Sequence, residues 1–194
     1  MNSCWKDLLN CHNESEAFAN IYNFHVNDLL SYGVSLGFDE DTSRDAVHDV
    51  FYIMYRDKNK LDHVENVKSY LFRSFRNRLF NIHNKTSRIS PLTDEETPFT
   101  TNITVLDTII SKEELEKLQQ TVSKLLDELT PRQREAIYLR YMQEMEYEDI
   151  AELLKMDSNS ARRLVHRGIK SLRTNGSISK KHLFVLSILL AYHF

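Results

Sequence analysis

The stretch from residue 130 to residue 173 most narrows the folds open to this chain. Thr130 is a candidate N-cap, and Pro131 follows it at the first helical position, where proline is tolerated. From Tyr147 to Leu154 apolar residues recur at helical spacing, and a longer helix is expected from Ser158 to about Arg173. A leading helix, a short helix, a turn and a longer helix in this order predict a helix-turn-helix.

The last of these helices, for which Asp157 is a candidate N-cap, divides into two faces. The apolar residues that should face a core are Ala161, Leu164, Val165, Ile169 and Leu172. The remaining directions carry Ser158, Asn159, Ser160, Arg162, Arg163, His166, Arg167 and Lys170, and no acidic residue occurs from Ser158 to the end of the sequence. Short polar side chains and arginines near a helix N-terminus suit base edges, and later basic side chains suit phosphates. The alternative is the solvated basic face of an ordinary helix, and the turn in front of it favours the DNA-binding interpretation.

Charge is segregated along the chain, although the formal net charge is only −3. Every charged residue between residues 66 and 93 is basic, and the same holds from residue 158 onward. Residues 113–157, between them, are mainly acidic. Two basic segments separated by an acidic one indicate two nucleic-acid surfaces on one chain. Only four Gly and three Pro among 194 residues favour helices over strands and turns.

Other features argue against a metal, an export signal and a membrane span. Cys4 and Cys11, with His12 beside the second, lack the CxxC spacing of a zinc site, so two reduced cytosolic thiols are the expectation. The N-terminus has no basic-then-apolar signal segment. The apolar run at residues 183–192 is shorter than the about 20 residues that span a bilayer. The sequence predicts a cytoplasmic protein without a cofactor.

Two amphipathic helices are expected in the first part of the chain. The stripe of the first is Phe18, Tyr22, His25, Leu29, Tyr32 and Leu36, in which His25 is expected to be a packed residue rather than a ligand. The second begins at Thr42, which forms a candidate capping box with Asp45, and runs to about Arg56. Its buried side is predicted to be Ala46, Val47, Val50, Ile53 and Met54. Its exposed acidic and aromatic face is predicted to be Asp45, His48, Asp49 and Phe51.

A third helix is predicted from Asn66, its candidate cap, to about Asn84. Its apolar stripe is Val67, Leu71, Phe72, Phe75, Leu79 and Ile82. Its other side carries Lys68, Arg73, Arg76, Asn77, Arg78, Asn81 and Asn84. Basic and amide side chains interleaved with Tyr70 and Phe80 suit a surface that holds a nucleic-acid backbone and stacks on unpaired bases. The alternative is that the aromatic residues complete a three-helix core, which is preferred for Phe72 and Phe75.

The rest of the chain divides into a linker, a second module and a tail. Residues 86–106 lack a sustained period and are predicted to be an extended linker. Residues 107–175 form the second module, which begins with a helix leading to the helix-turn-helix. The apolar tail at residues 176–194 is expected to pack on that module or on a partner rather than lie on a membrane, because it lacks a polar face.

With both modules placed, the chain resembles bacterial sigma factors of the extracytoplasmic-function group, which keep only regions two and four. The resemblance covers roughly residues 18–85 and 106–173. It implies an all-α protein of two small helical domains, with region two in residues 1–85 and region four in residues 107–175. Such a protein binds core RNA polymerase through the beta-prime clamp and the beta flap, binds promoter DNA, and is controlled by an anti-sigma factor. It has no enzyme activity and no small-molecule substrate.

In region two, the sequence DAVHDVFYIMY looks like the family helix that docks on the polymerase clamp. The resemblance therefore implies core-polymerase contacts by Asp45, His48, Asp49 and Phe51, although the family usually has Gln where His48 stands. Residues 66–85 look like the segment that opens and reads the −10 element, and the preceding loop at 57–65 sits where the family captures a flipped base. The implied −10 contacts are Lys68, Arg73, Arg76, Asn77, Asn81 and Lys85. Asn84 and Lys85 stand where the family often has two basic residues.

In region four, the sequences LTPRQREAIYLRY and YEDIAELL are close to the family pattern, whereas Lys155 and Met156 replace the usual Gly and small apolar residue of the turn. The implied −35 contacts are Ser158, Asn159, Ser160, Arg162, Arg163, His166, Arg167 and Lys170. Three alternatives stay open. One is a helix-turn-helix regulator that acts without core polymerase. The others are a protein-interaction module whose helix-turn-helix is a scaffold, and a sigma-like subunit brought to DNA by another targeting factor.

Overall fold

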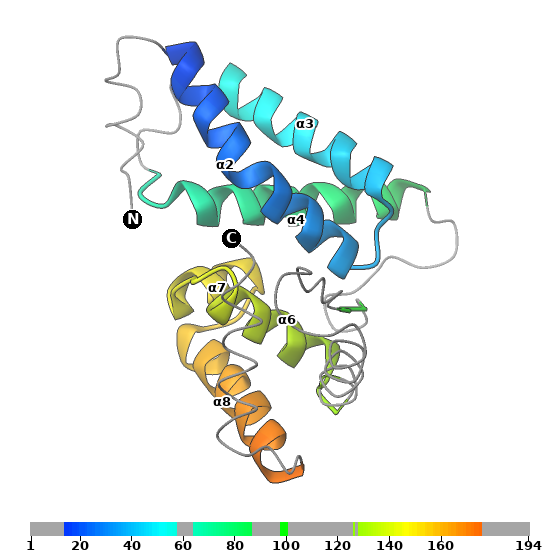
Figure 1. Cartoon of the computed structure of the whole chain (residues 1–194), viewed down its shortest axis with the longest axis vertical. Helices are drawn as coiled ribbons and strands as arrows, with labels where there is room; N and C mark the ends of the chain where they lie inside the picture. Colours follow the sequence, from blue (N-terminus) through cyan, green and yellow to red (C-terminus); the bar gives the residue numbers. More distant parts are fainter. Residues whose placement is uncertain (1–13, 58–63, 87–97, 101–125, 127, 176–194) are drawn as a thin grey trace, which may run out of the picture. The chain divides into compact units, whose positions relative to one another are not determined.

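A computed structural model of the chain describes residues 14–57, 64–86, 98–100, 126 and 128–175. All regular elements within these ranges are helices, so the all-α prediction is confirmed. The chain divides between residues 94 and 95 into two compact units. The first contains α2 (Glu14–Ser35), α3 (Glu40–Arg56) and α4 (Val67–Thr86), and the second contains α6 (Pro131–Tyr141), α7 (Tyr147–Leu153) and α8 (Ser158–Asn175) (Figure 1).

The first unit is a three-helix arrangement in which α2, α3 and α4 all pack against one another. Its core includes the fully buried Leu29 and Tyr32 of α2, Val47 of α3, and Phe72 and Phe75 of α4. The ring centroids of Tyr32 and Phe72 are 5.2 Å apart, so aromatic packing joins α2 to α4. These members of the three predicted apolar stripes therefore meet in one core, and Phe72 and Phe75 are core residues as expected.

Gly33 lets the three helices approach closely. A Cβ atom at this position would lie 2.5 Å from the Oγ atom of Ser43 and 3.0 Å from the Cζ atom of Phe75. Gly33→Val should therefore overpack the core and lower the free energy of unfolding of the first unit by about 2 kcal/mol. Ser31→Val, on an exposed position of α2, is the matched control and should change stability little. Urea titration followed by circular dichroism measures both, and equal stabilities of the two variants would contradict the prediction.

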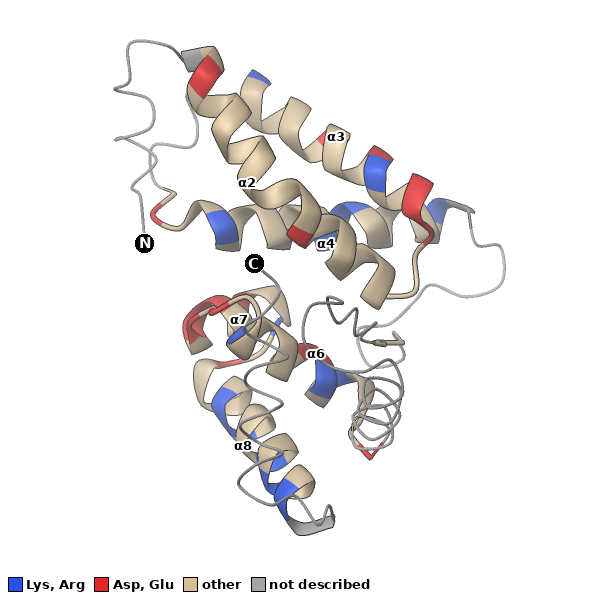
Figure 2. Cartoon of the chain, in the orientation of Figure 1, with Lys and Arg blue, Asp and Glu red and all other residues tan. Residues whose placement is uncertain are grey.

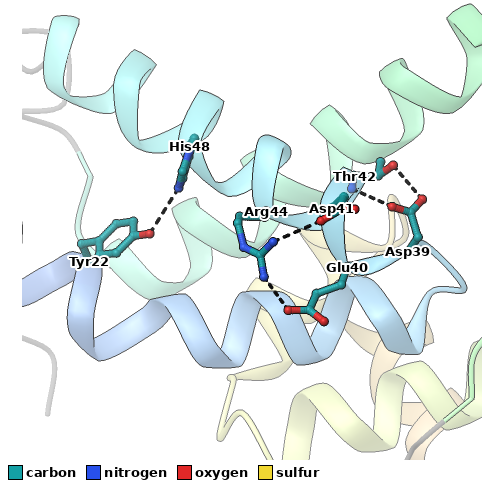
Figure 3. Close-up of polar contacts among 7 residues, drawn as sticks. All are labelled: Tyr22, Asp39, Glu40, Asp41, Thr42, Arg44 and His48. Atoms are coloured by element: carbon teal, nitrogen blue, oxygen red, sulfur yellow. Dashed lines mark hydrogen bonds and ion pairs between the residues drawn. The ribbon is translucent and has the colours of Figure 1, made fainter.

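The start of α3 differs from the prediction. Asp39, not Thr42, is the N-cap, and its carboxylate accepts hydrogen bonds from the backbone N–H of Thr42 at 2.8 Å and from the Thr42 hydroxyl at 2.7 Å (Figure 3). These hydrogen bonds, the backbone bond first, lower the pKa of Asp39. Thr42 was a plausible cap in the sequence because it precedes an apolar stripe. Asp39 prevails because its carboxylate accepts both bonds and its charge suits the positive end of the helix.

Three other predicted N-caps are confirmed. The Oδ1 atom of Asn66 accepts a hydrogen bond at 3.1 Å from the backbone N–H three residues later, and that of Asp157 does the same at 2.9 Å. Thr130 forms a reciprocal capping box with Gln133, and Pro131 occupies the first turn of α6. Each cap satisfies a backbone donor that the helix itself leaves unpaired, which fixes where α4, α6 and α8 begin.

In the second unit α8 packs on both α6 and α7. Lys155, in the turn between α7 and α8, has a φ of 54°, in the left-handed region that glycine adopts more easily. Gly168 is buried on α8, and a Cβ atom there would lie 2.7 Å from the Cδ1 atom of Ile137 on α6. The absence of a side chain at Gly168 therefore allows α8 to approach α6.

Phe99 belongs to the second unit, although the sequence placed it in the extended linker at residues 86–106. Its side chain is 1% exposed, and its ring makes an edge contact with the ring of Tyr138 at a centroid distance of 5.4 Å. The short segment around Phe99 is thus tied to α6 rather than extended in solvent. A single apolar residue between polar neighbours gave no periodic signal in the sequence.

Several predictions fall on residues outside the described ranges. They concern the thiols of Cys4 and Cys11 with the neighbouring His12, most of the helix expected before residue 129, and the tail at residues 176–194. Among the described residues, no group of three or more potential metal ligands comes together. None of the described helices is long and apolar enough to cross a bilayer.

Candidate nucleic-acid interface

Helix α8 presents a basic face to solvent. Its apolar side is buried against α6 and α7, with Ala161, Val165 and Leu172 at most 1% exposed. Asn159, Arg162, Arg163, His166, Arg167 and Lys170 are exposed, while Ser158 and Ser160 are half-buried. Lys and Arg lie along α8, whereas α7 carries acidic residues (Figure 2). The packing of α8 on α6 and α7 thus leaves the side that carries the eight predicted DNA-contact residues exposed or half-exposed.

Hydrogen bonds order the N-terminal end of that face. The Ser158 hydroxyl donates to Glu148 at 2.9 Å, and the Ser160 hydroxyl donates to Asp157. The guanidinium of Arg163 donates to the Ser160 oxygen at 2.8 Å. The hydroxyl of Ser160, and then its backbone N–H, lower the pKa of Asp157. The first turn of α8 therefore has side chains held in defined positions before any ligand binds.

Helix α4 carries the second predicted surface. Asn77, Asn81 and Lys85 are exposed, and Lys68 and Arg73 are half-buried. These five residues lie outside the core, as a DNA-contact role requires.

The prediction that Arg76 lies on the exposed polar side of α4 is wrong, because Arg76 is 1% exposed and lies in the core. Its guanidinium carbon lies 4.5 Å from the ring centroid of Phe80, which is itself only 9% exposed. Arg76 follows Phe72 by four residues and precedes Leu79 by three, so it shares the core-facing stripe. Neither Arg76 nor Phe80 is therefore placed to touch a DNA strand in this structure.

The exposed face of α3 also differs from the expected one. Asp45 and His48 are exposed and Asp49 is half-exposed, but Phe51 is 8% exposed and makes an edge contact with Tyr22 at a centroid distance of 5.0 Å. Phe51 follows Val47 by four residues, which places it on the buried stripe. Ile53, predicted to be buried, is 40% exposed instead.

Two of the predicted polymerase-contact residues already have partners within the first unit. The Nε2 atom of His48 lies 3.5 Å from the hydroxyl oxygen of Tyr22 (Figure 3). The carboxylate of Asp49 accepts a hydrogen bond from the Nε atom of Arg78 at 2.7 Å and forms an ion pair with the same guanidinium. This pair joins the acidic face of α3 to the basic helix α4. No local pattern in the sequence indicates this pair, because the two residues are 29 positions apart.

Part of the second unit matches a known protein family. Residues 119–172 match the family model described as "Sigma-70, region 4". The second unit is therefore similar to sigma-70 region 4 over these residues. Helices α6 and α7 lie wholly within the matched residues and α8 lies almost wholly within them, so the similarity includes the helix-turn-helix and its basic face.

The similarity in fold extends beyond the region 4 domain. The chain is similar to the sigma factor RpoE in a co-crystal structure with the anti-sigma factor NepR from Bartonella quintana, with a TM-score of 0.56 and 22% sequence identity. The match covers 88% of this chain and 98% of that chain. No curated protein matches the chain by sequence. The region 4 match and the shared fold confirm the predicted resemblance to sigma factors.

Proposed function

We propose that the chain is a transcription initiation factor that binds core RNA polymerase and directs it to promoters. The observation that carries the proposal is the match to sigma-70 region 4 in a unit whose helix α8 has no acidic residue and exposes its basic face. A second basic surface, on α4 of the first unit, supplies the other contact that promoter opening needs. The protein acts by binding, without enzyme activity, a cofactor or a small-molecule substrate, and it works in the cytoplasm, where the polymerase is.

The region 4 domain would hold the −35 duplex. Helix α8 fits the major groove, with residues of its first turns at base edges and later basic residues at phosphates. The base-reading set is Ser158, Asn159, Ser160, Arg162 and Arg163. His166, Arg167 and Lys170 lie further along the same exposed face and suit the backbone.

The first unit would hold the melted −10 strand. Lys68, Arg73 and Lys85 offer charge to the backbone, and Asn77 and Asn81 offer amides to unpaired bases. Arg76 supports this surface from inside the core. Binding free energy for the separated strand replaces any need for ATP hydrolysis, because unpaired bases are bound only after the duplex opens.

Core polymerase would dock on the exposed side of α3, at Asp45, His48 and Asp49. Phe51 supports that helix from the core instead of touching the partner. An anti-sigma factor is a further expected partner, because the similar sigma factor was crystallised with one. Such a factor would hold the protein inactive until released.

One observation favours a second candidate function. Asp49 and His48 both have intramolecular partners, so core polymerase must replace or share contacts that the free protein already makes. A helix-turn-helix regulator that acts without core polymerase would leave both contacts intact. The test must therefore separate loss of the Asp49 carboxylate from loss of its pairing with Arg78.

The experiment is co-elution of the full chain with purified core RNA polymerase in the absence of DNA. Asp49→Arg should abolish co-elution, because it reverses the charge of the proposed docking face. The double variant Asp49→Arg, Arg78→Asp restores an internal ion pair in the opposite sense and should still fail to co-elute. Arg78→Asp alone shows what loss of the pair costs while Asp49 is kept.

Each outcome discriminates between the candidates. Recovery of co-elution in the double variant would assign the effect of Asp49→Arg to the internal ion pair and would remove Asp49 from the docking face. Failure of the folded native chain to co-elute, with sequence-selective binding to duplex DNA, would support the regulator without polymerase. Circular dichroism of every variant confirms that the helices are retained.

A further inference from the structure

A tyrosine at the start of α7 lies between the turn that follows α6 and the basic helix α8. Two guanidinium groups lie over the ring of Tyr147. The Cζ atom of Arg140, on α6, is 4.8 Å from the ring centroid, and that of Arg162, on α8, is 5.0 Å from it. One aromatic ring thus contacts cations from both neighbouring helices, at distances where cation–π attraction is significant.

Arg140 is fixed in place by the turn before α7. Its Nη1 atom donates a hydrogen bond to the backbone carbonyl of Met145 at 2.7 Å and lies 3.2 Å from a carboxylate oxygen of Glu146. Tyr147 follows immediately and is half-buried at the first position of α7. The ring is therefore held by helix α7 on its backbone side and by a well-anchored guanidinium, which makes it a rigid support.

Arg162 is the second cation over the ring of Tyr147. It is exposed on α8, and within the described part of the chain it makes no hydrogen bond and no ion pair with a carboxylate, so stacking leaves its N–H donors available. The neighbouring Arg163 is also exposed, but it donates to Ser160 and has no aromatic ring beneath it in the described residues. An unsupported arginine loses substantial rotamer freedom when it binds, and a stacked arginine has lost part of it beforehand.

The carboxylate of Glu148 also attracts the guanidinium groups of Arg140 and Arg162. It accepts a hydrogen bond from Ser158 at 2.9 Å, and its pKa is lowered by its own backbone N–H first, then by Ser158, with smaller effects of the positive charges of Arg162 and Arg140. The carboxylate therefore stays ionised near both guanidiniums and favours the arrangement in which they gather around Tyr147.

We propose that Tyr147 is a positioning residue for DNA recognition, whose ring holds the Arg162 guanidinium ready to contact the −35 duplex. The inference rests on the proposed function of the region 4 domain. Tyr147 acts through Arg162 and need not touch DNA itself. Its ring, not its hydroxyl group, carries the effect.

The test measures binding of the full chain to a labelled duplex that the native chain enriches from a random-sequence pool. Tyr147→Leu removes the ring and should weaken binding about fivefold, the size expected from losing a stacked, pre-ordered arginine. Tyr147→Phe keeps the ring and should bind like the native chain. In a chain that already carries Arg162→Ala, adding Tyr147→Leu should cause no further loss.

Arg163→Ala is the matched control for the double-variant comparison. Arg163 lies beside Arg162 and is equally exposed, but it does not stack on Tyr147. The losses caused by Tyr147→Leu and Arg163→Ala should therefore add on a logarithmic scale. Melting temperatures of all variants show whether α7 and α8 remain packed, so that a purely structural effect is recognised.

Several results would overturn the inference, and they are distinct from failure of the proposed function. Equal loss in Tyr147→Phe and Tyr147→Leu would assign the effect to the hydroxyl group. A loss from Tyr147→Leu that persists in the Arg162→Ala chain would show that Arg162 is not the residue positioned. If Arg162→Ala binds like the native chain, the inference fails while the DNA-binding function stands. If the folded native chain enriches no duplex, the proposed function fails and the inference fails with it.

Discussion

Replacing Arg76 by alanine should lower the free energy of unfolding of the first unit by about 3 kcal/mol. Arg76 is 1% exposed, so removal of its side chain leaves a cavity in the core of the first unit. The variant also loses the cation–π contact with Phe80, at 4.5 Å from the ring centroid. A DNA-contact residue on the surface would instead lower affinity with little change in stability.

Urea titration followed by circular dichroism measures this loss, and hydrogen exchange of α4 amides assigns it to the first unit. Asn77→Ala is the matched control, because Asn77 is the next residue and is exposed. It should change stability little and should weaken binding to single-stranded −10 DNA. If Arg76→Ala keeps native stability and loses only DNA affinity, the result would contradict a core role for Arg76.

Acidification should destabilise the first unit through His25. This side chain is 7% exposed, and burial first, then the positive charge of Lys68, lower its pKa from 6.5 to about 4. The unfolded chain therefore binds the proton more readily than the folded chain. Above about pH 6.5 both states leave His25 largely neutral, and no stability is lost through it. As the pH drops toward 4 the unfolded chain binds the proton first, and the loss of stability reaches about 2 kcal/mol by pH 5.

The measurement compares urea midpoints at about pH 7 and about pH 5 for the native chain and for His25→Leu. The variant has no titrating group at this position and should lose less stability on acidification, by about 2 kcal/mol. Asn23→Leu, at an exposed position two residues earlier on α2, should keep the native pH dependence. Parallel pH profiles of the native chain and His25→Leu would contradict the lowered pKa of His25.

Much of the helical organisation was predictable because it depends on local pattern. Asn66, Thr130 and Asp157 were identified as N-caps from residue type and position, and each accepts the expected hydrogen bond. The two faces of α8 were also predictable, since side chains at three- and four-residue spacing share one side of a helix. The resemblance of residues 130–173 to sigma region four was noticed from the same kind of local pattern, and residues 119–172 match the family model for that region.

Two errors arose because a buried stripe was predicted to be too narrow. Phe51 was assigned to the exposed face of α3 and Arg76 to that of α4, yet both lie on the borders of the buried stripes. A helix packed against two neighbours, as α3 and α4 are, buries a wider arc than a helix with one neighbour. Residue type favoured exposure of Arg76, but contact with Phe80 and the enclosing helices outweighed it.

The sequence by itself determined where the helices begin, which of their faces are apolar and where positive charge gathers, because these follow from properties of neighbouring residues. Only the tertiary structure decided which distant residues meet. It paired Asp49 with Arg78, placed Phe99 on Tyr138, and brought Arg140 and Arg162 to the ring of Tyr147. Such contacts depend on how helices pack in three dimensions, and no periodicity within one helix encodes them.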